Sequence, residues 1–97
     1  MKQFTFLFST QSLKDIEDAR DYYDSIETAV RKKFMMQLQQ CLYAIKRNPY
    51  FAGIRYEDIR CAQIKKFPYL VHYHIDEKNS LVRILAVYST YREPRSK

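Results

Sequence analysis

From Ser9 onwards, the hydrophobic residues of this chain change their spacing once, and this change limits what the chain can fold into. Up to Asn48, apolar residues recur every three or four positions, which is typical of amphipathic helices. After the loop that follows, they alternate with polar residues, which is typical of half-buried strands. A chain of 97 residues can build one core, with room for one sheet and about two helices. The sequence therefore predicts a single α+β domain spanning residues 1–97.

Two helices are expected between Ser9 and Asn48. Ser9, Thr10 and Ser12 each offer a hydroxyl group for the N-cap of the first helix, and the spacing from Ser12 to Asp15 also fits a capping box. The second helix should end near Asn48, because the following proline disfavours a helical conformation in the residue before it. Their apolar stripes contain Leu13, Ile16, Ala19, Tyr23 and Ile26 in the first helix, and Val30, Phe34, Leu38, Cys41 or Leu42, and Ile45 in the second.

Four strands are expected, one before the helices and three after them. The opening letters KQFTFLFS alternate polar and apolar residues, and residues 48–58 read as a loop. The three later strands are predicted at residues 60–67, 69–76 and 81–88, and the short polar link between the last two suits an antiparallel hairpin. The predicted order is β-α-α-β-β-β, with a helical hairpin packed on one face of a mostly antiparallel four-stranded sheet.

The charged residues are distributed unevenly along the chain. The net charge is +6, yet residues 10–27 contain six acids and only two bases, so the rest of the chain is strongly basic. A basic cluster at residues 31–33 opens the second helix, where cations oppose the helix dipole. A basic body favours an acidic partner, either nucleic acid or an acidic protein segment. The alternative is a solvated basic surface that has no dedicated partner.

Several classes of function find no support in the sequence. The apolar runs are too short to cross a membrane, and the opening residues do not resemble a secretory signal peptide. Cys41 and Cys61 are expected to be reduced packing residues of a cytoplasmic protein. A single glycine allows no phosphate-binding loop, so no nucleotide cofactor is expected. His72 and His74 share one strand face and are expected to be half-exposed, with too few further ligands for a metal site.

Basic and aromatic side chains gather on the three later strands and at the end of the chain. Such groups can hold phosphates and stack on bases, and cations can stabilise charge beside a scissile phosphate without metal. For any one of them, a solvated surface charge is the simpler interpretation. The candidate site residues are Arg60, Lys65, Lys66, Arg83, Tyr88, Tyr91, Arg92 and Arg95.

Two stretches of the chain, together with the order of its elements, resemble the RelE/ParE toxin superfamily and in particular its plasmid-stabilisation branch. They are IKKFPYLVHYHID at residues 64–76 and RILAVYSTYREP at residues 83–94. The resemblance implies the toxin of a type II toxin–antitoxin pair, which inhibits growth until a small antitoxin neutralises it. The antitoxins of this superfamily are usually acidic at the contact, which would account for the basic body.

The resemblance implies two different activities. RelE members cleave messenger RNA on the ribosome without metal, using Lys and Arg with a C-terminal Tyr, whereas ParE members block DNA gyrase. By position, Lys65 and Lys66 match the strand lysines of the nucleases, and Arg92 matches the arginine that ends the last strand. Leu70 stands where the nucleases carry an arginine, and Tyr91 precedes Arg92 instead of following it. These four polar residues would therefore be catalytic only if the chain is a nuclease, and we expect ParE-like action by binding.

For a toxin that acts by binding, contacts are expected from Arg60, Arg83, Tyr88 and Arg95, although Arg95 also reads as an ordinary solvated end. The antitoxin is expected in the groove between the helical hairpin and the sheet, where an amphipathic helix could bury apolar surface. Two alternatives remain, a ribosome-dependent mRNA nuclease and a non-toxic basic binding module of the same fold. No oligomeric state is predicted.

Overall fold

The computed structural model describes residues 3–91, which form two helices and five strands in a single sheet. The predicted contacts at Arg92 and Arg95 lie outside the described residues. In chain order, the elements are β1 (Thr5–Phe8), α1 (Thr10–Ile26), α2 (Thr28–Arg47), β2 (Ile54–Tyr56), β3 (Ile59–Gln63), β4 (Tyr69–Asp76) and β5 (Leu81–Ser89).

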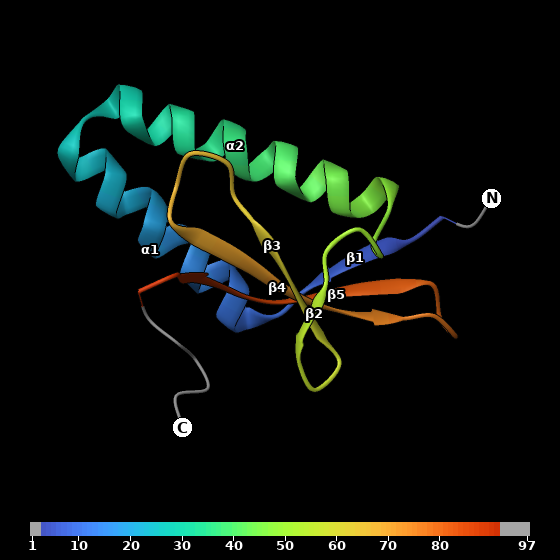
Figure 1. Cartoon of the computed structure of the whole chain (residues 1–97). Helices are drawn as coiled ribbons and strands as arrows, with labels where there is room; N and C mark the ends of the chain where they lie inside the picture. Colours follow the sequence, from blue (N-terminus) through green and yellow to red (C-terminus); the bar gives the residue numbers. More distant parts are fainter. Residues whose placement is uncertain (1–2, 92–97) are drawn as a thin grey trace.

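The sheet has the strand order β1-β5-β4-β3-β2, and the two helices lie together on one side of it (Figure 1). β1 runs parallel to β5, and the other neighbouring strands are antiparallel. This arrangement confirms the predicted α+β fold with a helical hairpin on a mostly antiparallel sheet. Between residues 3 and 91, no helix is both long and apolar enough to cross a membrane.

The sheet differs from the four-stranded prediction by the addition of β2, which lies inside the predicted loop at residues 48–58. β2 has only three residues, and it pairs with β3 alone, through Ile54 opposite Arg60 and Tyr56 opposite Ile59. Ile54 is exposed, so the strand has no buried apolar face that would leave an alternating pattern in the sequence. The turn that joins β2 to β3 places Glu57 at a positive φ of 49°.

The strand predicted at residues 60–67 ends earlier, at Gln63. Residues 64–68 form a turn instead, in which the Ile64 N–H donates to the Tyr69 carbonyl at 2.9 Å and Lys66 has a φ of 71°. Pro68 has no N–H to contribute to a sheet ladder, which favours a turn at this point. The two lysines that were expected on a strand therefore lie in the β3–β4 turn.

The start of α1 is fixed by Ser9. The Ser9 Oγ accepts a hydrogen bond from the Ser12 N–H at 2.9 Å, and the Ser12 hydroxyl donates back to the Ser9 carbonyl at 2.8 Å. The predicted capping box from Ser12 to Asp15 does not form, because the Asp15 carboxylate bonds elsewhere. α1 and α2 are separated by a single extended residue, Glu27, so the hairpin is tight.

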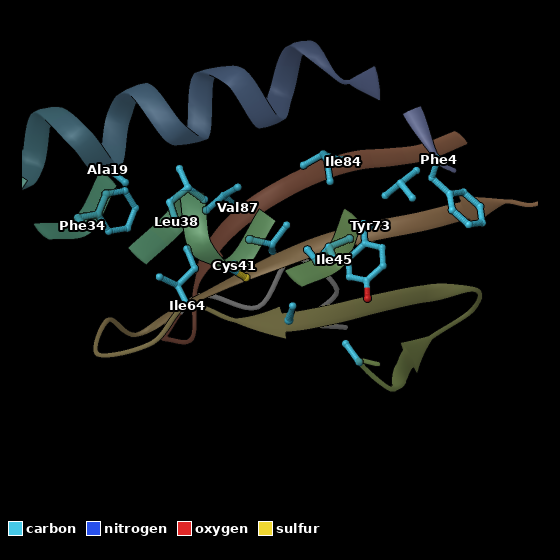
Figure 2. Close-up of a cluster of buried hydrophobic side chains, with 14 of the residues drawn as sticks. Phe4, Ala19, Phe34, Leu38, Cys41, Ile45, Ile64, Tyr73, Ile84 and Val87 are labelled. Carbon is cyan, nitrogen blue, oxygen red and sulfur yellow. The ribbon is translucent and has the colours of Figure 1, made fainter. Parts of the chain in front are cut away.

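The core lies between the two helices and the sheet (Figure 2). α2 inserts four buried side chains, which are Phe34, Leu38, Cys41 and Ile45. From the sheet, Tyr73 is fully buried, and its hydroxyl donates to the Pro49 carbonyl at 2.7 Å. Burial raises the pKa of Tyr73 to about 12, so this hydroxyl stays protonated and keeps its hydrogen bond.

Beyond the end of β1, side chains at the start of α1 form hydrogen bonds with the backbone at the edge of β5. β1 pairs with β5 only as far as Ile84, and Leu85 forms a bulge, because Ile84 and Ala86 face consecutive residues of β4. The Ser9 hydroxyl donates to the Leu85 carbonyl at 2.9 Å. The Asp15 carboxylate accepts from the Val87 N–H at 3.0 Å. Side chains of this segment therefore satisfy backbone groups that no strand covers.

Candidate binding surfaces

Arg60 faces the helical side of the sheet and acts on the chain itself. It shares its strand face with Ala62, which is buried in the core. Its guanidinium donates to the Ala52 carbonyl at 2.7 Å and lies 5.3 Å from the centre of the Tyr50 ring. These contacts hold the segment between α2 and β2 against the sheet, which is a structural role.

Arg83 lies near the β4–β5 turn, where it pairs with an acid. Its guanidinium is 3.0 Å from a carboxylate oxygen of Asp76, which also accepts a hydrogen bond from the Asn79 amide at 3.0 Å. Hydrogen bonds from Asn79 and then from Arg83 lower the pKa of Asp76 to about 2. Asp76 is therefore ionised at neutral pH and neutralises the charge of Arg83 locally.

Lys65 and Lys66 are both exposed in the β3–β4 turn, at the opposite end of β4 from Arg83. Lys66 comes three residues before Tyr69, which begins β4, whereas Arg83 pairs with His74. At about 3.3 Å per residue, the strand alone separates these two groups by more than 10 Å. Tyr91 follows the end of β5 and is 88% exposed. Within residues 3–91, the predicted cations are therefore not brought together around one point.

The sheet face turned away from the helices, called the open face below, is aromatic and apolar at its centre. Strand alternation places Leu70, His72, Ala86 and Tyr88 on this face, and the first three are buried. Leu70 pairs with Tyr88, so the position at which a nuclease would carry an arginine holds a packed apolar side chain. Of the predicted contact residues, Tyr88 and Arg83 lie on this face.

His72 is not half-exposed as predicted, since only 2% of it is accessible. Its ring packs edge-on against Tyr88, with the ring centres 5.4 Å apart, and also lies 5.8 Å from the ring of Tyr56. Tyr56 belongs to β2, which the sequence pattern did not reveal, so its cover over His72 could not be predicted. Within residues 3–91, no three His, Cys, Asp or Glu side chains are close enough to share a metal ion.

Three of the grooves formed by residues 3–91 border the helices. The first runs along the outer side of α2, has a volume of about 460 Å³, and is lined by Arg31, Lys32, Met35, Met36, Leu38, Gln39 and Leu42. The second, of about 230 Å³, lies between α2 and β3 and is lined by Gln37, Gln40, Cys41, Ala44, Phe51, Gln63 and Lys65. The third, of about 460 Å³, lies between α1 and the end of β5 and is lined by Asp15, Asp18, Ala19, Tyr22, Tyr69, Val87, Ser89 and Tyr91.

The first groove was missed by the sequence analysis, although a signal for it exists. The core stripe of α2 runs through Phe34, Leu38 and Ile45, yet the helix carries further apolar residues beside that stripe. Met36 is 55% exposed, and its neighbour Met35 is only partly buried. Apolar residues in excess of what the core uses indicate a second apolar strip, which favours an interaction surface.

A helical hairpin covering one face of a mixed sheet is the architecture expected from the resemblance to the RelE/ParE class. The family model described as "ParE toxin of type II toxin-antitoxin system, parDE" matches residues 6–94. The chain therefore belongs to the ParE toxin family. No curated protein sequence matches it.

Solved structures of toxin–antitoxin proteins have a similar fold. The chromosomal ParDE TA system from P. aeruginosa matches with a TM-score of 0.76 at 10% identity, over 90% of this chain and 96% of that one. The E. coli DinJ-YafQ toxin-antitoxin complex matches with a TM-score of 0.64 at 16% identity, over 92% and 94%. The toxin-antitoxin complex RelBE2 from Mycobacterium tuberculosis matches with a TM-score of 0.57 at 22% identity, over 90% and 98%. At these identities, the likeness concerns the fold.

Proposed function

We propose that this chain is a cytoplasmic toxin that inhibits growth by binding a cellular target, with DNA gyrase as the target by analogy with ParE toxins, and that a cognate antitoxin neutralises it. Membership of the ParE toxin family supports the toxin assignment. Similar folds solved as toxin–antitoxin complexes support the antitoxin. The absence of any membrane-spanning helix among the described residues is compatible with a cytoplasmic site of action.

The placement of the cations favours binding over RNA cleavage. Cleavage of this kind needs a base, an acid and cations around one phosphate. In the described part of the chain, Arg60 donates a hydrogen bond to the loop before β2, and Arg83 pairs with Asp76. Lys65 is exposed in a turn at the other end of the sheet from Arg83. The buried Leu70 occupies the centre of the open face near Tyr88. Such a face can bury apolar area against a protein, for which Tyr88 and Arg83 remain our candidate contacts.

The target is tested with the purified toxin in two parallel assays. We expect inhibition of gyrase supercoiling in a dose-dependent manner and, in a ribosome-containing translation reaction, intact messenger RNA by primer extension. Ribosome-dependent cuts that disappear in Arg92→Ala would instead establish the nuclease. Expression without growth arrest, combined with tight antitoxin binding, would identify a non-toxic binding module.

We further propose that the antitoxin docks in the groove along α2, and not in the groove between the hairpin and the sheet that the sequence analysis expected. The antitoxin is expected to be acidic at its contact, and the groove between α1 and β5 contains Asp15 and Asp18, which would repel it. The groove along α2 instead combines Met35 and Met36 with two cations, which are Lys32 and Arg31, although Arg31 also pairs with Asp24 at 2.9 Å. An amphipathic acidic helix could place its apolar stripe on the methionines and its carboxylates beside these cations.

Met36→Ala tests the docking groove. Loss of this side chain should weaken binding of the cognate antitoxin about tenfold, because a well-packed apolar contact is worth on the order of 1.4 kcal/mol. The measurement is isothermal titration calorimetry with both purified proteins. Tyr43→Ala is the matched control, since Tyr43 is an exposed apolar residue of the same helix that lies outside this groove. Equal affinities for the two variants would contradict the docking site.

A further inference from the structure

Cys61 and His72 form a close pair on the open face. They lie directly opposite each other on β3 and β4, and the Cys61 sulfur is 3.3 Å from the His72 Nδ1. The Tyr56 hydroxyl lies 3.2 Å from the same nitrogen. In the tautomer that leaves Nδ1 unprotonated, this nitrogen can accept a hydrogen bond from either the thiol or the phenol. The imidazole is thus set to receive the thiol proton.

The surroundings of the pair hold the imidazole in place and leave the Cys61 residue partly exposed. His72 is nearly fully buried and is flanked by the rings of Tyr56 and Tyr88, which fix its orientation. Cys61 is half-buried, and its position opposite His72 places it on the open face. A partly exposed thiol beside an imidazole is the usual setting of a reactive cysteine.

The second cysteine has the opposite surroundings. Cys41 is buried in the core between α2 and the sheet (Figure 2), and its thiol lies 3.7 Å from the Gln63 carbonyl. Burial raises the pKa of Cys41 to about 11, which suppresses the nucleophilic thiolate. The same molecule therefore contains an internal reference thiol that should react slowly.

We propose that Cys61 is a modification site that exchanges with small disulfides such as oxidised glutathione, with His72 as the proton acceptor. The thiol proton moves to the His72 Nδ1, and the thiolate sulfur attacks one sulfur of the small disulfide. The disulfide bond breaks as the new bond forms, and the departing thiolate takes the proton back from His72. The products are a mixed disulfide on Cys61 and one small thiol, so atoms, charge and electrons balance.

This site goes beyond the proposed toxin function. It makes the chemistry of the open face depend on the balance between thiols and disulfides in the cell. The adduct separates Cys61 from His72 and places a charged peptide beside an aromatic and apolar surface. Any partner that docks across the open face would meet this group. Because exchange is reversible, a thiol reductant restores the original surface.

Single-thiol variants test the site. The folded full-length Cys41→Ala protein, which keeps Cys61, should form one glutathione adduct with oxidised glutathione, measured by intact mass over time. Cys61→Ala, which keeps Cys41, should react at least about tenfold more slowly, because its thiol is buried. In denaturant the two proteins should react at similar rates, which shows that the difference comes from the fold. Equal rates in the folded proteins would overturn the proposal.

The role of His72 is tested in the Cys41→Ala protein. His72→Gln should slow adduct formation about fivefold at mildly acidic pH, and the two rates should converge at alkaline pH, where a thiol ionises without help. Tyr56→Phe removes the competing donor at Nδ1, so the rate should stay the same or rise by up to about twofold. A rate that is unchanged in His72→Gln, or a fall in Tyr56→Phe as large as that in His72→Gln, would overturn proton transfer to His72.

Should His72→Gln fail to fold, the Cys61 rate in the parent protein can be compared with that of a model thiol peptide. A rate no higher than the peptide's at mildly acidic pH would count against the proposal.

Discussion

Replacing Phe34 with alanine is expected to lower the free energy of unfolding by about 3–5 kcal/mol, the range for removing a buried aromatic side chain. Phe34 is fully buried, and its ring centre lies 5.1 Å from that of Tyr23, 5.2 Å from that of Phe67 and 5.4 Å from that of Tyr69. These rings come from α1, the β3–β4 turn and the start of β4. The substitution therefore leaves a cavity at the point where both helices meet one end of the sheet.

Chemical denaturation followed by circular dichroism measures this loss. A small domain has a total stability of about 5–15 kcal/mol, so Phe34→Ala should lose a large share of it. Met36→Ala is the matched control, because Met36 lies on the same helix and is 55% exposed. Its stability should change by no more than about 0.5 kcal/mol. A loss below about 1 kcal/mol for Phe34→Ala would show that the aromatic cluster does not hold the layers together.

The sequence predicted those parts of the fold in which burial alone sets the pattern. In α2, the spacing of Phe34, Leu38 and Ile45 identified the buried stripe, because a helix with one buried face must repeat its apolar residues at three and four. The long strands β4 and β5 were also located correctly, since each buries apolar residues under the helices. β2 was missed because its edge position buries too little surface to leave a pattern.

The candidate site was less predictable than the fold. A sequence shows which residue types are present, but their positions in space depend on the turns and the strand register. Arg60 and Arg83 looked alike in the sequence. In the structure, however, Arg60 bonds a loop on the helical side of the sheet, whereas Arg83 pairs with Asp76 on the open face. Lys65 was predicted on a strand but lies in a turn, because β3 ends at Gln63. Each of these placements depends on pairing register, which local patterns do not encode.

His72 shows the same limit on the open face. Alternation correctly placed it on the same face as His74, but its burial depends on Tyr56 and Tyr88, which come from strands on both sides of β4. Its contact with Cys61 depends on the register between β3 and β4. The features that give this chain its individual chemistry are therefore cross-strand pairs, whereas the family fold follows from patterns along the chain.

Replacing Asp15 is expected to cause the second large loss of stability. This side chain of α1 bonds the backbone at the edge of β5, beyond the point where β1 ends. Its carboxylate is buried and accepts hydrogen bonds from the Val87 N–H at 3.0 Å and from the Gln11 side-chain amide at 2.7 Å. Asp15→Ala should lower the free energy of unfolding by about 2–3 kcal/mol, because it removes a charged acceptor and leaves the Val87 N–H buried without a partner. Asp15→Asn should lose less, since its amide oxygen can still accept from Val87.

Asp18→Ala is the control for Asp15. Asp18 lies one turn further along α1 and makes an exposed ion pair with Lys14, at 3.6 Å, so its removal should cost no more than about 0.5 kcal/mol. Denaturation curves of the three variants and the parent protein measure these differences, and hydrogen exchange of the Val87 amide localises them. If Asp15→Ala and Asp18→Ala prove equally stable, the carboxylate does not anchor β5. If Asp15→Ala alone is destabilised and the Val87 amide exchanges faster, α1 holds the bulged edge of β5 where β1 cannot reach it.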